Sequence, residues 1–179
     1  MNREKELEND PELLEFFRLF NKLYQKLGHG FIKELKRLPS LSDLLIDRWE
    51  RAQMLGFGKN TNIYDNSLVL GEVKVGKECW IGPNTILDGS GKLAIGNNCS
   101  ISANVQLYSH DTVKWAVSGG TEPYEYAETK IGNNCYIGPN TVITKGVIIG
   151  DGSIIGANSF VNKSFEAHSK IGGNPAKNL

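Results

Sequence analysis

"IGNNCYIGPNTVITKGVIIGDGSIIGANSFVNKSF", residues 131–165, carries an apolar residue at every sixth position. The same period runs back through the chain and one step beyond this stretch, with a two-residue insertion inside "DGSGKLA". Its positions are Phe57, Ile63, Val69, Val75, Ile81, Leu87, Ile95, Ile101, Leu107, Val113, Ile131, Ile137, Ile143, Ile149, Ile155, Val161 and Ala167. A period that persists over so many units indicates a repeat architecture.

A six-residue unit with one inward apolar side chain and a Gly/Asn-rich corner predicts a short strand followed by a sharp turn, because Gly and Asn tolerate positive φ best. Three such units make one triangular coil, and coils stack about 4.8 Å apart as parallel strands. "IGNNC" occurs at 95–99 and again at 131–135. The interval of six units predicts two coils between these pentapeptides, on one face. Cys79, Cys99 and Cys135 share one position of the unit and are expected inside.

Residues 1–56 show a helical period instead. Asp10 and Pro11 suit a helix start, Gly28 and Gly30 suit its end, and Ser42 suits the cap of a further helix reaching Leu55. The apolar stripe at spacings of three and four consists of Leu13, Phe16, Phe17, Phe20, Leu23, Tyr24 and Leu27. It predicts packing against the rest of the protein or a neighbouring subunit. The fold class expected is therefore mainly β: a parallel β-helix over 57–179, after a helical segment over 1–56.

Charge and composition narrow the classes of function. Lys+Arg and Asp+Glu each total 20, so no basic surface for nucleic acid or an anionic membrane is expected. No apolar run approaches the roughly 20 residues that span a bilayer. "MNREKELENDPE" at the start has no apolar core of a secretory signal. Three cysteines with no close pair suit a reducing compartment, so a cytoplasmic location is expected.

With this register, "IGNNCYIGPNTVITKGVIIGDGSIIGANSFVNKSF" and the closing "GGNPAKNL" (172–179) make residues 57–177 similar to a known family. They resemble the left-handed β-helix, hexapeptide-repeat acyltransferases, which include galactoside, maltose and xenobiotic acetyltransferases. The resemblance implies a left-handed coil, acetyl-CoA as co-substrate and a homotrimer with its sites in the subunit clefts. It also implies transfer of an acetyl group to a sugar hydroxyl, in the assembly of surface polysaccharides.

His110 is the candidate general base. It lies in "LYSHDTVKW", where regular coils give way to the only long irregular stretch, 112–129, and the family carries its base at this place. Imidazole is partly neutral at pH 7 and can accept a proton. Asp111 is a candidate for fixing the imidazole tautomer, or else a turn-forming or substrate-contacting residue. Ser109 is disfavoured as an acyl-enzyme nucleophile because the family uses direct attack.

The motifs of the family place coenzyme A along the last coils. The matching positions are Pro139, Ala157, Asn162, Lys163 and Lys177. The two lysines suit phosphate groups, although each is also compatible with a solvated surface position, and Asn162 stands where the family usually has threonine.

The protruding loop at about 112–129 mixes aromatic, acidic and glycine residues. Its candidate substrate-binding residues are Trp115, Ser118, Gly119, Glu125 and Tyr126. Aromatic rings stack on sugar faces and carboxylates bind hydroxyls. The same composition suits a loop that clasps a neighbouring subunit, and both roles stay open.

Three rival functions remain. One is N-acetylation of a nucleotide-linked amino sugar, and another is a non-catalytic β-helix scaffold. The third is a carbonic anhydrase-like metalloenzyme, since such enzymes share this fold. His29, His110 and His168 stand far apart in the sequence, without the close histidine pair that such a zinc site requires, so no metal is expected.

Overall fold

The computed structural model describes residues 2–179, so Met1, the first residue of the predicted helical segment, lies outside the described part. The chain divides into one unit that ends at Asp47 and another from Arg48 to Leu179. The predicted boundary at residue 56 falls later in the chain, after a helix that the structure assigns to the second unit.

The first unit consists of α1 (Arg3–Glu6), α2 (Pro11–Leu35) and α3 (Leu41–Leu45). The Asp10 carboxylate accepts a hydrogen bond from the backbone N–H of Leu13 at 3.1 Å, as a capping residue should. In residues 2–179 no helix has both the length and the apolarity that a bilayer crossing requires.

Two predicted helix limits are wrong. α2 runs through Gly28 and Gly30 and ends where Lys36 adopts φ 54°, since a glycine inside a helix costs only about 1 kcal/mol. A Cβ on Gly28 would lie 3.0 Å from Leu38 Cδ1, so this glycine admits the returning chain. The next helix is capped by Ser40 instead of Ser42 and stops at Ile46, whose backbone is extended.

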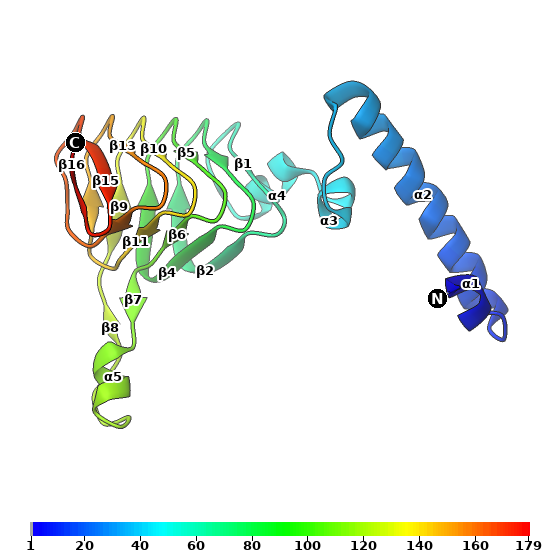
Figure 1. Cartoon of the computed structure of the whole chain (residues 1–179), viewed down its shortest axis with the longest axis horizontal. Coiled ribbons are helices and arrows are strands. Elements are labelled where there is room, and N and C mark those ends of the chain that lie inside the picture. Colours follow the sequence, from blue (N-terminus) through cyan, green and yellow to red (C-terminus); the bar gives the residue numbers. More distant parts are fainter. Residues whose placement is uncertain (1) are drawn as a thin grey trace. The chain divides into compact units, whose positions relative to one another are not determined.

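The helix α4 (Arg48–Met54) seals the first coil of the second unit (Figure 1). Ala52 is buried in the same apolar core as Ile63. The Arg51 guanidinium donates to the carbonyl oxygens of Tyr64 and Ser67, the latter at 2.8 Å. The open end of the β-helix is thereby closed by a helix whose Arg51 contacts backbone oxygens and the Asp65 carboxylate of the first coil.

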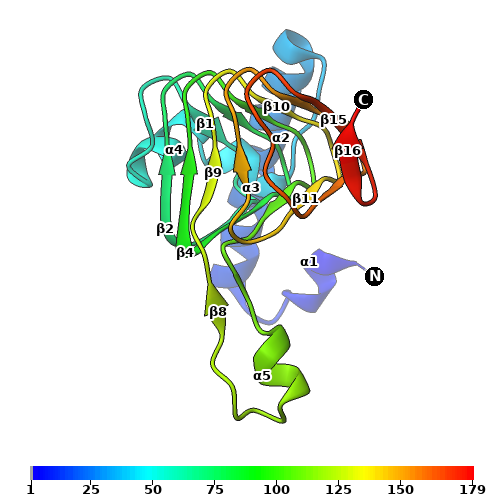
Figure 2. The same cartoon turned by 90° about the vertical axis from the view of Figure 1, so that its left-hand side faces the viewer.

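The second unit is a parallel β-helix of about six turns, from residue 62 to 171 (Figure 2). One face is formed by β1 (Asn62–Ile63), β3 (Trp80–Ile81), β5 (Ser100–Ile101), β10 (Tyr136–Ile137), β13 (Ile154–Ile155) and β15 (Lys170–Gly173). The other two faces are formed by β2 (Leu68–Val75), β4 (Ile86–Ile95), β6 (Gln106–Leu107), β9 (Thr129–Ile131), β11 (Val142–Ile143), β12 (Ile148–Ile149) and β14 (Phe160–Val161). The final strand, β16 (Ala176–Asn178), pairs antiparallel with β15.

The core is a stack of inward side chains in register. Ile81 pairs with Ile101, Ile101 with Ile137 and Ile137 with Ile155, and all four are buried. At the corners, Asn residues with positive φ stack too: Asn104 donates to Asn140 at 3.0 Å. The three cysteines are buried, as predicted. The parallel β-helix expected from the six-residue period is therefore confirmed.

For the two "IGNNC" pentapeptides, the predicted face is confirmed but the predicted number of coils between them is wrong. They lie on one face, but Ile95 pairs directly with Ile131, and the Asn97 backbone N–H donates to Asn133 Oδ1 at 2.9 Å. They are thus one coil apart. The rest of the interval between them leaves the wall as a loop, and Val113, which is 60% exposed, belongs to that loop instead of the core.

The loop projects from the side of the β-helix and carries a short helix (Figures 1 and 2). It leaves through β7 (His110–Asp111), forms α5 (Val113–Val117) and returns through β8 (Glu125–Tyr126), which pairs antiparallel with β7. At the other end of the repeat, Phe165 is buried and bridges to Ile149, whereas Ala167 is exposed. The last coil is shorter at this corner, so the predicted inward place of Ala167 is wrong.

The two isoleucines of β13 test the inward register. Ile155 is 0% exposed and its neighbour Ile154 is 48% exposed. Ile155→Ala should lower the free energy of unfolding by about 2–5 kcal/mol, because it removes buried methylenes and leaves a cavity. Ile154→Ala, the matched control, should cost less than about 1 kcal/mol. Urea denaturation measures both, and equal losses would contradict the register.

Candidate active site

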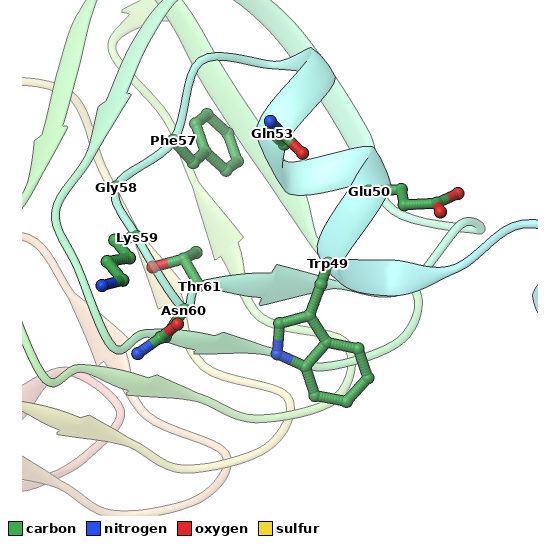
Figure 3. A pocket seen from close by; sticks show the side chains of 8 residues that line it. All are labelled: Trp49, Glu50, Gln53, Phe57, Gly58, Lys59, Asn60 and Thr61. Carbon is green, nitrogen blue, oxygen red and sulfur yellow. The ribbon is translucent and has the colours of Figure 1, made fainter.

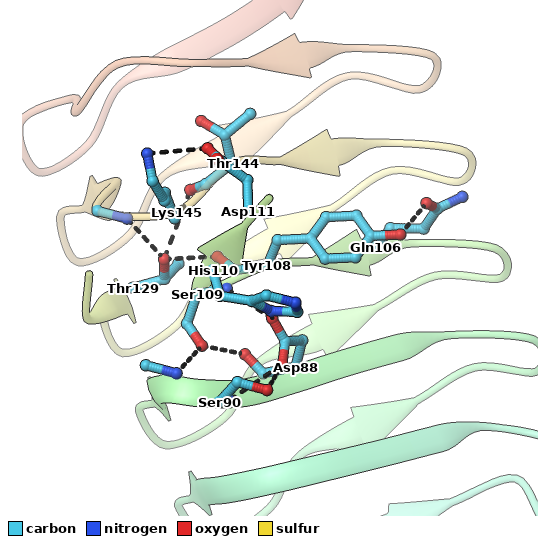
Figure 4. A network of polar contacts seen from close by, with 12 residues as sticks. Asp88, Ser90, Gln106, Tyr108, Ser109, His110, Asp111, Thr129, Thr144 and Lys145 are labelled. Carbon is cyan, nitrogen blue, oxygen red and sulfur yellow. Dashed lines mark hydrogen bonds and ion pairs between the residues drawn. The ribbon is translucent and has the colours of Figure 1, made fainter. Parts of the chain in front are cut away.

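A buried carboxylate holds the candidate base. Asp88, on β4, is fully buried, and its Oδ2 lies 2.5 Å from Nδ1 of His110 on β7 (Figure 4). The His110 side chain is partly exposed. The pair thus joins a sealed carboxylate to an imidazole that reaches solvent.

Hydrogen-bond donors surround Asp88. Its Oδ1 accepts from the backbone N–H and the hydroxyl of Ser90 at 3.0 and 2.6 Å, and its Oδ2 accepts from the backbone N–H of Ser109 at 3.1 Å. Burial raises the pKa of Asp88, but the donors of Ser90, His110 and Ser109 outweigh it and lower the pKa to about 2. Asp88 is therefore an anion that fixes the proton of His110 on Nδ1, and Nε2 keeps the basic lone pair.

The two-residue insertion in "DGSGKLA" builds this cradle. A Cβ on Gly89 would lie 2.3 Å from the Glu72 carbonyl oxygen, and one on Gly91 would lie 2.2 Å from that of Ser109. The backbone N–H of Gly91 donates to Ser109 Oγ at 2.7 Å, and Ser109 Oγ donates to the Asp88 carbonyl oxygen at 2.6 Å. Ser109 is buried and its hydroxyl proton is engaged, so it is no candidate nucleophile.

Asp111 does not occupy the orienting position. Its carboxylate lies 2.8 Å from Lys145 Nζ, and this cation also lies 3.5 Å from Glu125. The hydrogen bond from Lys145 is the main reason why the pKa of Asp111 is lowered. The geometry expected of an acid that orients the imidazole is therefore found at Asp88, because the side chain of Asp111 turns to Lys145 on the next coil.

An open cavity of about 420 Å³ lies over this corner of the β-helix. It is lined by Tyr108, His110, Asp111, Thr112, Val113, Thr144 and Lys145. Tyr126, on the returning strand of the loop, stacks on the His110 ring with centroids 5.9 Å apart. The imidazole therefore faces a cavity large enough for a small molecule, with an aromatic ring against one side.

The loop residues predicted to bind substrate fall into two groups. Tyr126 and Glu125 lie beside the cavity, Tyr126 on the His110 ring and Glu125 in the ion pairs with Lys145 and Lys114. The other group lies further along the loop. Trp115 packs edge-to-face on Tyr124, the Ser118 hydroxyl donates to the Trp115 carbonyl oxygen, and Gly119 turns the chain with φ 67°.

The residues predicted to bind coenzyme A also fall into two groups. Asn162 and Lys163 follow Val161, which pairs with Ile143, so they lie one coil beyond Thr144 and Lys145 at the same corner as the cavity. This column leads from His110 along the β-helix axis.

The other three predicted coenzyme A residues lie elsewhere. Pro139 and Ala157 lie on adjacent coils at the preceding corner, where a Cβ added to Gly138 would meet the backbone nitrogen of Ala157. Lys177 lies on β16, in the closing hairpin.

A second cavity, of about 430 Å³, lies between α4 and the first coil (Figure 3). It is lined by Trp49, Glu50, Gln53, Phe57, Gly58, Lys59, Asn60 and Thr61. None of these residues was predicted to belong to a site. In the described chain, residues 2–179, no group of three or more His, Cys, Asp or Glu side chains is arranged to hold a metal ion.

Among the candidate site residues that the sequence did not predict are Asp88 and, in the cavity lining, Tyr108, Thr144 and Lys145. The signal for Asp88 was present: an acid directly after the inward Leu87, within the one insertion that breaks the period before the loop. Lys145 gave no comparable signal, since a lysine at a corner of the coil is ordinarily solvated.

Comparisons with known proteins agree with this architecture. Residues 128–163 match the family model described as bacterial transferase hexapeptide (six repeats), and residues 72–109 match that of the hexapeptide repeat of succinyl-transferase. Protein CapG of Staphylococcus aureus is 38% identical over 111 residues, which are 60% of this chain and 64% of that protein. The match thus spans somewhat less than two thirds of CapG.

Two solved structures share the fold. A hexapeptide-repeat acetyltransferase from Vibrio cholerae superposes with a TM-score of 0.64 at 23% identity, covering 90% of this chain and 88% of that one. Galactoside acetyltransferase in complex with coenzyme A superposes with a TM-score of 0.62 at 24% identity, covering 89% and 77%.

The low pKa of Asp88 predicts an acid-dependent loss of stability. Because the folded pKa of about 2 lies below the ordinary 3.8, the ionised carboxylate stabilises the fold above pH 3.8, and this contribution disappears as the pH falls toward 2. The wild type should lose about 2 kcal/mol more than Asp88→Asn between pH 6 and pH 2. Urea unfolding across this range measures it. Glu166→Gln, at an exposed position, should follow the wild type, and parallel curves for Asp88→Asn would refute the charged cradle.

Proposed function

We propose, because the chain belongs to the hexapeptide-repeat transferase family, that it is a coenzyme A-dependent acyltransferase that acetylates a hydroxyl of a sugar. The observation that carries this proposal is the His110 imidazole, which a buried Asp88 holds in one tautomer at the edge of an open cavity. A buried carboxylate paired with a partly exposed imidazole at a cavity is typical of a functional site and is not required by a scaffold.

His110 acts as the general base. Its Nε2 takes the proton of the acceptor hydroxyl as that oxygen forms a bond to the thioester carbonyl carbon. The tetrahedral intermediate collapses, the carbon–sulfur bond breaks, and the imidazolium returns the proton to the thiolate of coenzyme A. Asp88 stabilises the imidazolium and keeps Nδ1 protonated throughout, as the buried acid of a catalytic triad does.

The acceptor sugar occupies the cavity beside the loop. Tyr126 gives an aromatic surface next to the imidazole, and Asp111, Thr144 and Lys145 supply polar groups for sugar hydroxyls. The residues further along the loop, Trp115, Ser118 and Gly119, either extend this surface or clasp a neighbouring subunit. Acetylation of a surface polysaccharide is the setting that the resemblance favours.

The donor lies along the column from His110 toward the later coils. Asn162 and Lys163 occupy that column, with Lys163 exposed to meet an anionic phosphate. Pro139, Ala157 and Lys177 lie at another corner and at the end of the coil. They reach the same donor only if two copies form the cleft, which is why a homotrimer with sites between subunits is part of the proposal.

His110→Ala should lower turnover by about 10²–10⁴-fold, the usual contribution of a positioned base. Release of free coenzyme A from acetyl-CoA, measured against a library of sugar acceptors, identifies the acceptor and tests the variant. His29→Ala, on α2, is the control and should keep full turnover. If acetyl-CoA does not shift the melting temperature of the protein and is not consumed with any acceptor, the protein is a scaffold.

Asp88→Asn separates the two candidate orienting acids. It should lower kcat by about 10²-fold or more with little change in KM, because the acceptor and donor contacts remain while the tautomer is lost. Asp111→Asn should act mainly on KM, since Asp111 lines the cavity and pairs with Lys145. The reverse pattern would restore Asp111 as the orienting residue. Steady-state kinetics of both variants decide between them.

A further inference from the structure

One side of α2 is apolar and exposed. Phe16, Leu19 and Leu23 follow one another at spacings of three and four, so they lie on one side of the helix, and they are 65%, 60% and 44% exposed. Among residues 2–47 only Gly28 and Leu44 are buried. Each large apolar side chain gains about 1.5–3 kcal/mol on burial, so this surface favours a partner.

The same side of α2 is hollow further along. A depression of about 340 Å³ is lined by Lys26, Leu27, Gly30, Phe31, Glu34 and Leu35. Gly30 is one of these lining residues, and a Cβ added there would meet no atom within 4 Å. The N-terminal half of the helix thus presents the exposed ring of Phe16, which stacks on Phe20, and the C-terminal half presents a depression.

The Phe16 ring and the depression at Gly30 are equally far from Leu23 along the helix. Phe16 stands seven residues before it and Gly30 seven residues after it, and seven residues are nearly two helical turns, so all three face the same way. When two such helices run antiparallel about an axis through Leu23, the Phe16 ring of each lies over the Gly30 depression of the other. This is the self-complementarity that a two-fold interface requires.

Charge favours the same arrangement. The first turns of α2 carry Glu12 and Glu15, and the region from its last turn onward carries Lys33, Glu34, Lys36 and Arg37. An antiparallel pair places the acidic end of each helix beside the net basic end of the other, where Lys33, Lys36 and Arg37 outnumber Glu34, which stands opposite Glu12. A parallel pair places ends of the same net charge side by side.

We propose that α2 is a self-association helix, which pairs antiparallel with α2 of a second copy of this chain and inserts Phe16 into the depression over Gly30. The occupant is a second copy and not a membrane, because the ring and the depression stand at equal spacings on either side of Leu23, and the two ends of the helix have opposite net charge. This pairing links copies through their N-terminal units, independently of any contact between β-helices.

A single engineered cysteine tests whether the two-fold axis of the proposed pair passes through Leu23. In the full-length protein, Leu23→Cys should form a disulfide-linked dimer under mild oxidation, because the two copies of residue 23 meet at the two-fold axis. Cys79, Cys99 and Cys135 are 1–2% exposed and give little background. Lys22→Cys, turned to the charged side of the helix, is the matched control and should stay largely monomeric on a non-reducing gel. Equal cross-linking of the two variants would overturn the proposal.

Filling the depression tests the interface itself. Gly30→Leu should weaken self-association by at least about tenfold in sedimentation equilibrium, since a buried anchor is lost. Leucine favours a helix over glycine, so circular dichroism should show no loss of helix. His29→Leu, on the charged side, controls for added apolar surface and should leave association unchanged. The pairing is wrong if Gly30→Leu keeps the wild-type mass in sedimentation equilibrium. It is also wrong if the substitution lowers the melting temperature without weakening self-association, because this would mean that α2 packs on its own chain.

Discussion

Each coil of the β-helix places its inward apolar residue directly on the equivalent residue of the coil before it. Ile81, Ile101, Ile137 and Ile155 form one such column, and parallel backbone hydrogen bonds hold the strands in the same register. A side chain displaced by one residue would point outward, because strand neighbours alternate. The six-residue period is therefore fixed by packing, and departures from it are confined to corners. The corner of the candidate active site is where the chain departs twice, first in the insertion that carries Asp88 and then in the loop that begins at His110.

The buried carboxylate is costly, and the fold offsets this cost locally. A charge removed from water must find hydrogen bonds, and Asp88 finds them within three residues of itself on one side and from Ser109 and His110 on the other. Gly89 and Gly91 permit the necessary close approach of backbones. As a consequence, a residue with a side chain at either glycine would clash with the neighbouring backbone. In return, the imidazole is held against a rigid wall while its ring stays partly exposed in the lining of the cavity.

The period of apolar residues was sufficient to predict the β-helix, because a buried column leaves a simple mark on the sequence. It could not predict where the wall is interrupted. Val113 has the right residue type at the right interval, but the loop happens to span a whole number of repeat units, so the count continues through it unbroken. His110 could be found because it stands beside the loop. Asp88 could not be paired with it, since a corner and a whole turn of the coil separate them in sequence and only the stacked coils bring them together. Gly28 misled in the same way: close packing on Leu38, and not a helix end, accounts for it.

The direct pairing of Ile95 with Ile131 has a consequence for how such proteins diversify. The wall closes beneath the loop as though the loop were absent, so the loop adds nothing to the packing of the column. A segment of different length or composition can be grafted between β7 and β8 without altering a single rung. The rigid wall and the loop are thus separable parts, and the loop can change while the imidazole and its carboxylate stay in place.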